Sequence, residues 1–156
     1  MRVEWNPNTL RVIFCGGRDF KESRMLSYVL WYVHERRGLA DLVHGGQRGA
    51  DQMANRWAFE HGVHRTEIRA EWSKYGSTKA LMVRNRKMFD LKPQGVIAFP
   101  GDVNSRAVVQ SARQHGVAVL DAEALYSKYT AKRQALEATI CEIPPGASAI
   151  HHSSRA

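Results

Sequence analysis

Three short segments combine glycine with arginine, aspartate or serine, the residue types that hold phosphate groups in proteins. They read Gly16-Gly17-Arg18-Asp19, Gly45-Gly46-Gln47-Arg48-Gly49-Ala50-Asp51 and Pro100-Gly101-Asp102-Val103-Asn104-Ser105, and are called here the first, second and third glycine loops. Glycine lets a backbone approach a ligand closely, and a guanidinium binds a phosphate through two parallel hydrogen bonds. We therefore expect one anion-binding site, with Arg18 and Arg48 as its clamps.

Each glycine loop lies between a short apolar run and a segment with helical periodicity. The sequence predicts strands at 10–15, 40–44, 65–69, 96–99 and 117–120, and helices at 23–37, 50–61, 78–91, 105–115 and 122–138. This alternation predicts an α/β fold, a Rossmann-like three-layer sandwich with a mostly parallel five-stranded sheet. The carboxyl ends of parallel strands share one edge, so the three loops should meet there. The helices that follow them should offer unpaired amides to phosphate.

Length and composition restrict the class of protein. The 156 residues predict one domain over 1–139 and a loosely structured C-terminal tail over 140–156. No apolar run reaches the roughly 18 residues of a membrane span, and residues 1–10 lack the apolar stretch of a signal peptide, so we expect a cytoplasmic protein. No metal-ligand, Ser-His-Asp or Cys-His spacing occurs. We therefore expect no metal and no other cofactor, and whether the chain is an enzyme stays open.

The net charge of +8 favours anionic partners, since a positive surface attracts them over long range. The basic residues are scattered along the chain instead of forming one run. Nucleotides, nucleic acid and phosphorylated ligands all fit this charge.

Several other polar and aromatic residues have two readings each. Trp72 and Tyr75, predicted to lie in a loop over 71–76, either stack on a base or cover the sheet edge or an oligomer contact. Asp51 either accepts hydrogen bonds from ribose hydroxyls or stabilises a helix dipole, and Asp19 either contacts ligand or caps a helix. His44, inside a predicted strand, fits a hydrogen-bonded core histidine better than a catalytic base.

The loops match neither G-x-G-x-x-G nor G-x-x-x-x-G-K-[ST], which disfavours ordinary dehydrogenases and P-loop ATPases. Over about residues 11–120 the chain resembles the YspA-like branch of the SLOG superfamily. The resemblance lies in the ordered series of the three loops, Trp72, Gly76, the pair Arg84-Asn85 and Met88. The resemblance implies a modified Rossmann fold that binds nucleotides or nucleotide-derived signals. The predicted ligand-binding residues are Gly16, Gly17, Arg18, Asp19, Gly45, Gly46, Arg48, Gly49, Ala50, Asp51, Trp72, Arg84, Asn85, Pro100, Gly101, Asn104 and Ser105.

The SLOG superfamily includes the LOG cytokinin-activating hydrolases, whose motif P-G-G-x-G-T-x-x-E ends in a glutamate that takes part in cleavage. In the same register this chain has Asp102 for the second glycine and Val108 for the glutamate. Asn104 still tolerates a left-handed backbone, and Ser105 keeps a hydroxyl for capping. Val108 has no group that transfers a proton, so the match favours binding over phosphoribohydrolase activity.

Three functions follow as hypotheses. The first is a sensor or sequestering protein for a nucleotide or nucleotide-derived ligand. The second is a nucleotide hydrolase that uses Asp19, Asp51 or Asp102, and the third is a nucleic-acid-binding module related to the DNA-processing protein DprA. Related hydrolases form homodimers, so we also expect a homodimer or higher homo-oligomer. Trp31, Tyr32, Trp57 and Phe59 would provide apolar side chains for its contact.

Overall fold

The computed structural model describes residues 10–146. By their internal contacts the residues form two compact units, one ending at Tyr126 and the other beginning at Ser127. The elements run in the order β1 (Leu10–Cys15), α1 (Ser23–Arg37), β2 (Leu39–His44), α2 (Ala50–Glu60), β3 (His64–Glu67), α3 (Trp72–Asp90), β4 (Gly95–Ala98), α4 (Val103–Gln114), β5 (Ala118–Asp121) and α5 (Ala122–Cys141).

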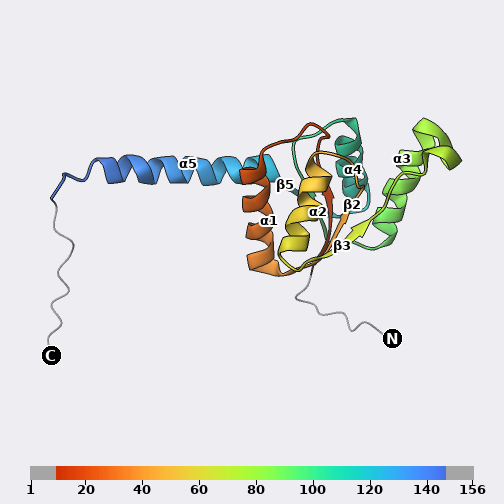
Figure 1. The fold of residues 1–156 in the computed structure, drawn as a ribbon, viewed down its shortest axis with the longest axis horizontal. Helices are drawn as coiled ribbons and strands as arrows, with labels where there is room; N and C mark the ends of the chain where they lie inside the picture. The colour runs from red at the N-terminus through yellow and green to blue at the C-terminus, as the bar shows by residue number, and fades with distance from the viewer. Residues whose placement is uncertain (1–9, 147–156) are drawn as a thin grey trace, which may run out of the picture. The chain divides into compact units, whose positions relative to one another are not determined.

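The strands form one five-stranded sheet in the order β3-β2-β1-β4-β5, and every neighbouring pair is parallel. Helices α1 and α2 cover one face, while α3 and α4 cover the other (Figure 1). This confirms the predicted α/β three-layer arrangement. The strand order reverses between β1 and β4, where open α/β sheets commonly bind their ligands.

The core lies in two clusters, one on each face of the sheet. Phe14 and Leu42 pack with α1 and α2, whereas Ile13 and Val43 pack with α3 and α4. Successive residues of a strand point to opposite faces, so a strand covered on both sides must be apolar throughout. This explains the unbroken apolar run Val12-Ile13-Phe14-Cys15 in β1.

Helix α3 differs from its prediction. It begins at Trp72, so the segment predicted as an aromatic loop is a helical turn, joined to the rest of α3 across a kink at Gly76 with φ 76° and ψ 177°. Glycine adopts this conformation without a Cβ penalty, and its presence suggested a loop. Within α3, Met88 and Phe89 are buried, whereas Met82 is exposed.

The other differences lie at helix ends and in the tail. Helix α4 begins at Val103, two residues earlier than predicted, because Asp102 caps it. Helix α5 continues to Cys141, past the start of the predicted tail. Residues 147–156 of that tail lie outside the described residues.

Both cysteines are free, with Cys15 buried and Cys141 exposed. Burial raises the pKa of the Cys15 thiol to about 12, which keeps it protonated at neutral pH. Within residues 10–146, no helix combines the length and the apolar character that a bilayer crossing requires.

Candidate functional site

The three glycine loops meet at the carboxyl edge of the sheet through direct backbone contacts. The Gly17 amide donates to the Pro100 carbonyl oxygen at 3.0 Å, and the Ala50 amide donates to the Gly17 carbonyl oxygen at 3.1 Å. The first loop is therefore bonded to both of the others. Loops that bond directly to one another hold the side chains they carry at fixed separations.

The glycines permit this close packing. Gly49 has a φ of 82°, and a Cβ there would overlap the carbonyl group of Arg18. A Cβ on Gly101 would overlap the Ser105 hydroxyl, and one on Gly16 would lie 2.5 Å from the Ala50 Cβ. Contacts within and between the loops thus account for these glycines without any ligand.

The amides at the start of the second loop have acceptors within the protein. The Asp51 Oδ2 atom accepts from the amides of Gly45 at 3.1 Å and Gln47 at 3.2 Å. The Gly46 amide donates to His44 Nδ1 at 3.0 Å, which leaves the ring proton on Nε2 to donate to the Asn55 side-chain oxygen at 3.1 Å. This makes His44 a hydrogen-bonded core histidine, as expected. Asp51 therefore fixes the second loop through two hydrogen bonds. Neither of the two roles suggested by the sequence, ribose binding and stabilisation of a helix dipole, included this one.

A carboxylate of the protein itself caps the amino end of α4. The Asp102 Oδ1 atom accepts from the amides of Asn104 at 3.1 Å and Ser105 at 3.3 Å. These amides were expected to face phosphate, and Ser105 was expected to supply the cap. The cap is instead Asp102, and Ser105 is buried. A carboxylate at this position repels an external phosphate.

Replacing Asp102 with Ala should lower the free energy of unfolding by about 1 kcal/mol, the usual contribution of a helix N-cap. Asp102→Asn should retain most of that stability, because its amide oxygen still accepts from both amides. Urea denaturation of both variants measures the difference. An unchanged stability of Asp102→Ala would show that the cap does not operate in solution.

Beside the second loop lies a cleft of about 590 Å³, a volume typical of small-molecule sites. We call it the arginine cleft because four guanidinium groups and no carboxylate line it. Its lining residues are Arg18, Gly45, Gly46, Gln47, Arg48, Arg69, Ala70, Trp72 and Arg84.

A second cleft of about 540 Å³ lies between the first and third loops, where the strand order reverses. It is lined by Gly17, Arg18, Asp19, Phe20, Arg48, Pro100, Gly101 and Asp102, and we call it the carboxylate cleft. Arg18 and Arg48 line both clefts. In the carboxylate cleft they face acids, with Arg18 Nε 3.7 Å from Asp102 and Arg48 Nη2 3.9 Å from Asp19.

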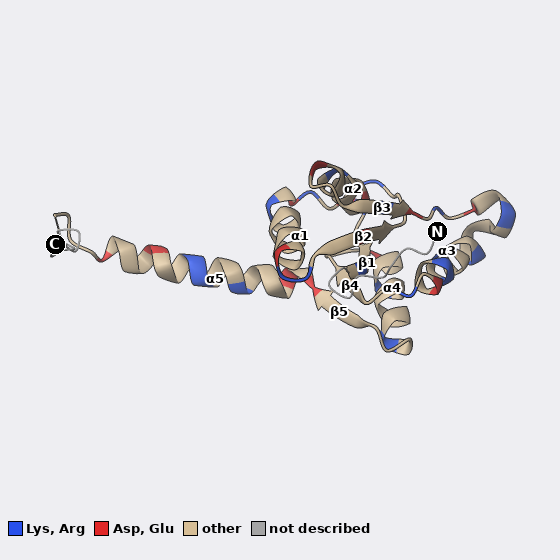
Figure 2. Cartoon of the chain, turned by 90° about the horizontal axis from the view of Figure 1, so that it is seen from below, with Lys and Arg blue, Asp and Glu red and all other residues tan. Residues whose placement is uncertain are grey.

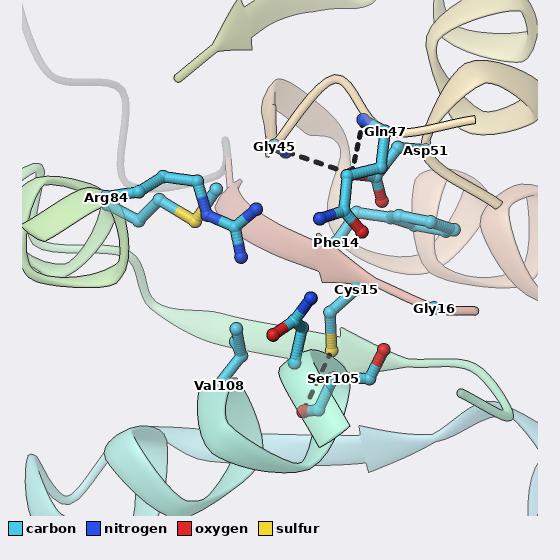
Figure 3. Close-up of a pocket in the computed structure, with 11 residues that line it drawn as sticks. Phe14, Cys15, Gly16, Gly45, Gln47, Asp51, Arg84, Ser105 and Val108 are labelled. Atoms are coloured by element: carbon cyan, nitrogen blue, oxygen red, sulfur yellow. Dashed lines mark hydrogen bonds between the residues drawn. The ribbon is translucent and has the colours of Figure 1, made fainter. Parts of the chain in front are cut away.

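Arg84 projects from α3 into the space between the second loop and Cys15 (Figure 3). Only 5% of this residue is exposed. Its Nε and Nη2 atoms donate to the Asn85 side-chain oxygen at 3.3 and 3.1 Å, and no carboxylate within residues 10–146 lies at ion-pair distance from it. A Cβ on Gly45 would lie 2.7 Å from Arg84 Nη1, so the loop backbone runs directly against the guanidinium.

Burial shifts the pKa values of both charged groups near this space. Desolvation lowers the pKa of Arg84 and raises the pKa of Asp51, because a buried charge loses its hydration. Attraction between these two groups opposes both shifts. A charged guanidinium held this way is stabilised by any anion that reaches it.

Most of the predicted site residues line one or more of three spaces, and three of them line none. Those lining the arginine cleft are Arg18, Gly45, Gly46, Arg48, Trp72 and Arg84, and those lining the carboxylate cleft are Gly17, Arg18, Asp19, Arg48, Pro100 and Gly101. A small cavity beneath the loops is lined by Gly16, Gly45, Asp51, Arg84, Asn104 and Ser105, among others. Gly49, Ala50 and Asn85 line none of these spaces and support the residues that do.

Sequence reasoning missed Arg69, which lines the arginine cleft and pairs with Glu67 at 3.0 Å. Its position gave a usable signal: it follows the end of β3 just as Arg18 follows the end of β1. Of the aromatic residues expected at an oligomer contact, Trp57 is buried, while Trp31 and Phe59 are exposed.

Comparison with known proteins identifies the family of this chain. The model of the YspA, cpYpsA-related SLOG family matches residues 10–75, which include the first two glycine loops and Trp72. The Gene 61 protein of Mycobacterium phage D29 is 37% identical to this chain over 120 residues, which cover 71% of this chain and 94% of the phage protein. The chain therefore belongs to the YspA, cpYpsA-related SLOG family, a membership that indicates nucleotide-related ligand binding in general.

Proposed function

We propose that this protein binds a nucleotide or nucleotide-derived ligand that carries at least two phosphate groups, with those groups in the arginine cleft. The observation that carries the proposal is Arg84, whose buried guanidinium has an amide oxygen and no carboxylate as its close partner. A buried charge without a counter-ion is costly, and a bound phosphate supplies one.

Side chains, and not loop amides, supply the recognition in this proposal. The amides of Gly45, Gly46 and Gln47 already have acceptors, and so do the first amides of α4. The guanidinium groups are the charged donors that line the cleft, and their planar forks suit phosphate oxygens. Several of them around one cleft favour a diphosphate over a single phosphate.

The remainder of the ligand has a place on either side of the phosphates. Arg18 and Arg48 join the arginine cleft to the carboxylate cleft, where Asp19 and Asp102 offer acceptors to sugar hydroxyls. Trp72, half exposed at the other wall of the arginine cleft, offers a ring on which a base can stack. Two variants show which cleft holds the nucleoside. Trp72→Leu should lower affinity if the base lies in the arginine cleft, and Phe20→Leu should lower it if the nucleoside lies in the carboxylate cleft.

The test is calorimetric titration with adenosine, AMP, ADP, ATP, NAD, ADP-ribose and inorganic pyrophosphate. Compounds with two linked phosphates should bind more tightly than AMP, and adenosine should bind least. Arg84→Met should weaken binding about 30-fold, equivalent to about 2 kcal/mol, because a charged hydrogen-bonding partner is lost. Arg86→Met is the matched control, since Arg86 is exposed on the same helix and lines neither cleft.

Adenosine binding as tightly as ADP, or Arg84→Met and Arg86→Met behaving alike, would contradict the proposal. Analysis of the recovered ligand after incubation separates binding from hydrolysis. Conversion of the ligand that is lost in Asp51→Asn would support the hydrolase alternative.

Nucleic acid is the second candidate, favoured by the net charge of +8. Lys and Arg occur on many helices and loops instead of on a single patch (Figure 2). Affinity for an oligonucleotide should then fall steeply with salt concentration, because each phosphate contact releases counter-ions. Tight, salt-insensitive binding of a small nucleotide with no retention of oligonucleotide would exclude this candidate.

A further inference from the structure

One wall of the arginine cleft belongs to a segment that has little contact with the core. Arg69, Ala70 and Trp72 line the cleft and lie between the end of β3 and the first turn of α3. Residues 71–79 are all exposed except Tyr75, which is half-buried. Few buried contacts mean that a segment moves at little cost. Packing against the core therefore does not fix the position of the Trp72 ring.

The backbone of α3 does not fix this position either. The φ of 76° and ψ of 177° at Gly76 lie far from helical values, so the turn that carries Trp72 is separated from the rest of the helix. This turn stands at an angle to the remainder of α3 (Figure 1). A Cβ on Gly76 would meet nothing within 4 Å, so no neighbouring group blocks a change of angle at the kink.

An ion pair spans the kink and ties the turn to the buried part of α3. Lys87 Nζ donates to Glu71 Oε2 at 2.9 Å, across a separation of 16 residues. Lys87 directly precedes Met88, which is buried, so the core holds the backbone on that side. At the start of the segment, the Ile68 amide donates to the His44 carbonyl oxygen at 2.9 Å. The cleft wall is thus anchored at both of its ends.

Both members of this pair respond to the contact. The hydrogen bond from Lys87 lowers the pKa of Glu71, and the same bond raises the pKa of Lys87. Within residues 10–146, no other ion pair joins residues 71–79 to the rest of the chain. Exposed ion pairs contribute little to overall stability. A weak link is nevertheless sufficient to set the position of a segment that nothing else holds.

We propose that Glu71 is a positioning residue, which acts through Lys87 to hold the Trp72 ring where the base of the bound ligand stacks on it. The inference rests on the proposed function, with the phosphates among the guanidinium groups of the arginine cleft. The guanidinium groups, and not Trp72, contact those phosphates. Glu71 therefore acts on recognition of the base and leaves recognition of the phosphates unchanged.

Calorimetric titration with ADP and with inorganic pyrophosphate separates these two effects. Glu71→Gln should lower the affinity for ADP relative to pyrophosphate about threefold, the size of effect an exposed ion pair supports. Exchanging the charges, with Glu71→Lys and Lys87→Glu together, should restore the ratio because the pair forms again. Glu60→Gln is the matched control. It breaks an exposed pair with Arg56 at 3.3 Å on α2, outside both clefts, and should leave the ratio unchanged.

The combination with Trp72→Leu tests whether Glu71 acts through the ring. Trp72→Leu should lower the same ratio about tenfold through loss of the stacked base, and adding Glu71→Gln should then cause no further loss. A further loss, or an unchanged ratio in either single variant, would overturn the inference. Binding of ADP and pyrophosphate that depends on Arg84 would leave the proposed function intact in that event. Failure of the unmodified protein to bind either compound would reject both.

Discussion

Gly49→Ala is expected to lower the free energy of unfolding by about 4 kcal/mol. The φ of 82° at Gly49 imposes strain on any other residue, about 2 kcal/mol. The added methyl group would also overlap the Arg18 carbonyl group, and overpacking of this kind costs about 2 kcal/mol. Urea denaturation followed by circular dichroism measures the total.

Gly62→Ala is the control for this prediction. Gly62 has a φ of 67°, and a Cβ there would meet nothing within 4 Å. Its substitution should therefore cost only the backbone strain, about 1 to 2 kcal/mol. The excess at Gly49 isolates the packing of the first loop against the second. Equal losses at the two positions would show that the loops separate readily in solution.

Asp51→Ala is expected to destabilise the fold by about 3 kcal/mol. The substitution leaves the amides of Gly45 and Gln47 without their acceptor, and hydrogen bonds to a charged group contribute roughly 1.5 to 3 kcal/mol each. Relief of the buried charge offsets part of that loss. Because these amides belong to the wall of the arginine cleft, ligand affinity should fall as well.

Asp51→Asn separates the hydrogen bonds from the charge. Its amide oxygen still accepts from both amides, so its unfolding free energy should stay within about 1 kcal/mol of the original at neutral pH. A loss as large as that of Asp51→Ala would show that the charge, and not the acceptor geometry, holds the second loop.

Comparing Asp51→Asn with the original protein also predicts how the free energy of unfolding depends on pH. Burial raises the pKa of Asp51 in the folded state above its usual value of 3.8, so the folded protein binds the proton more tightly than the unfolded chain does. The contribution of Asp51 to stability is therefore full below pH 3.8 and is lost as the pH rises through the folded-state pKa. Relative to the original, Asp51→Asn should gain stability across that window. Denaturation curves at several pH values measure the gain.

The strands and most helix limits could be predicted because their signals are local. From Leu10 to Cys15 every residue except Arg11 is apolar, so both faces of the segment are apolar. This pattern is typical of a strand that is covered on both sides. Helix α1 likewise shows its buried face through the spacing of Met25, Val29 and Val33. Such patterns depend on neighbours in the sequence alone.

The roles of individual residues in the site could not be predicted, because they depend on contacts between segments that are distant in the sequence. Only the family resemblance marked Arg84 as a site residue, because its spacing in the helix does not reveal that the second loop packs over it. Asp51 belongs to the second glycine loop and Asp102 to the third, but the sequence does not show which amides their carboxylates accept from. The loops were therefore predicted in the right place, while the internal use of their amides was not.

The central position of β1 in the sheet affects the order in which the strands can pair during synthesis. This strand is the first in sequence yet lies in the middle of the sheet. Arg11 contacts Asp41 across a separation of 30 residues, but its amide reaches the Gln94 side chain only across 83. During synthesis β1 can therefore pair with β2 long before β4 has left the ribosome, and one of its edges stays open for that interval. An open apolar strand edge pairs readily with other chains. The half-built sheet, and not the finished protein, is thus the form most exposed to aggregation.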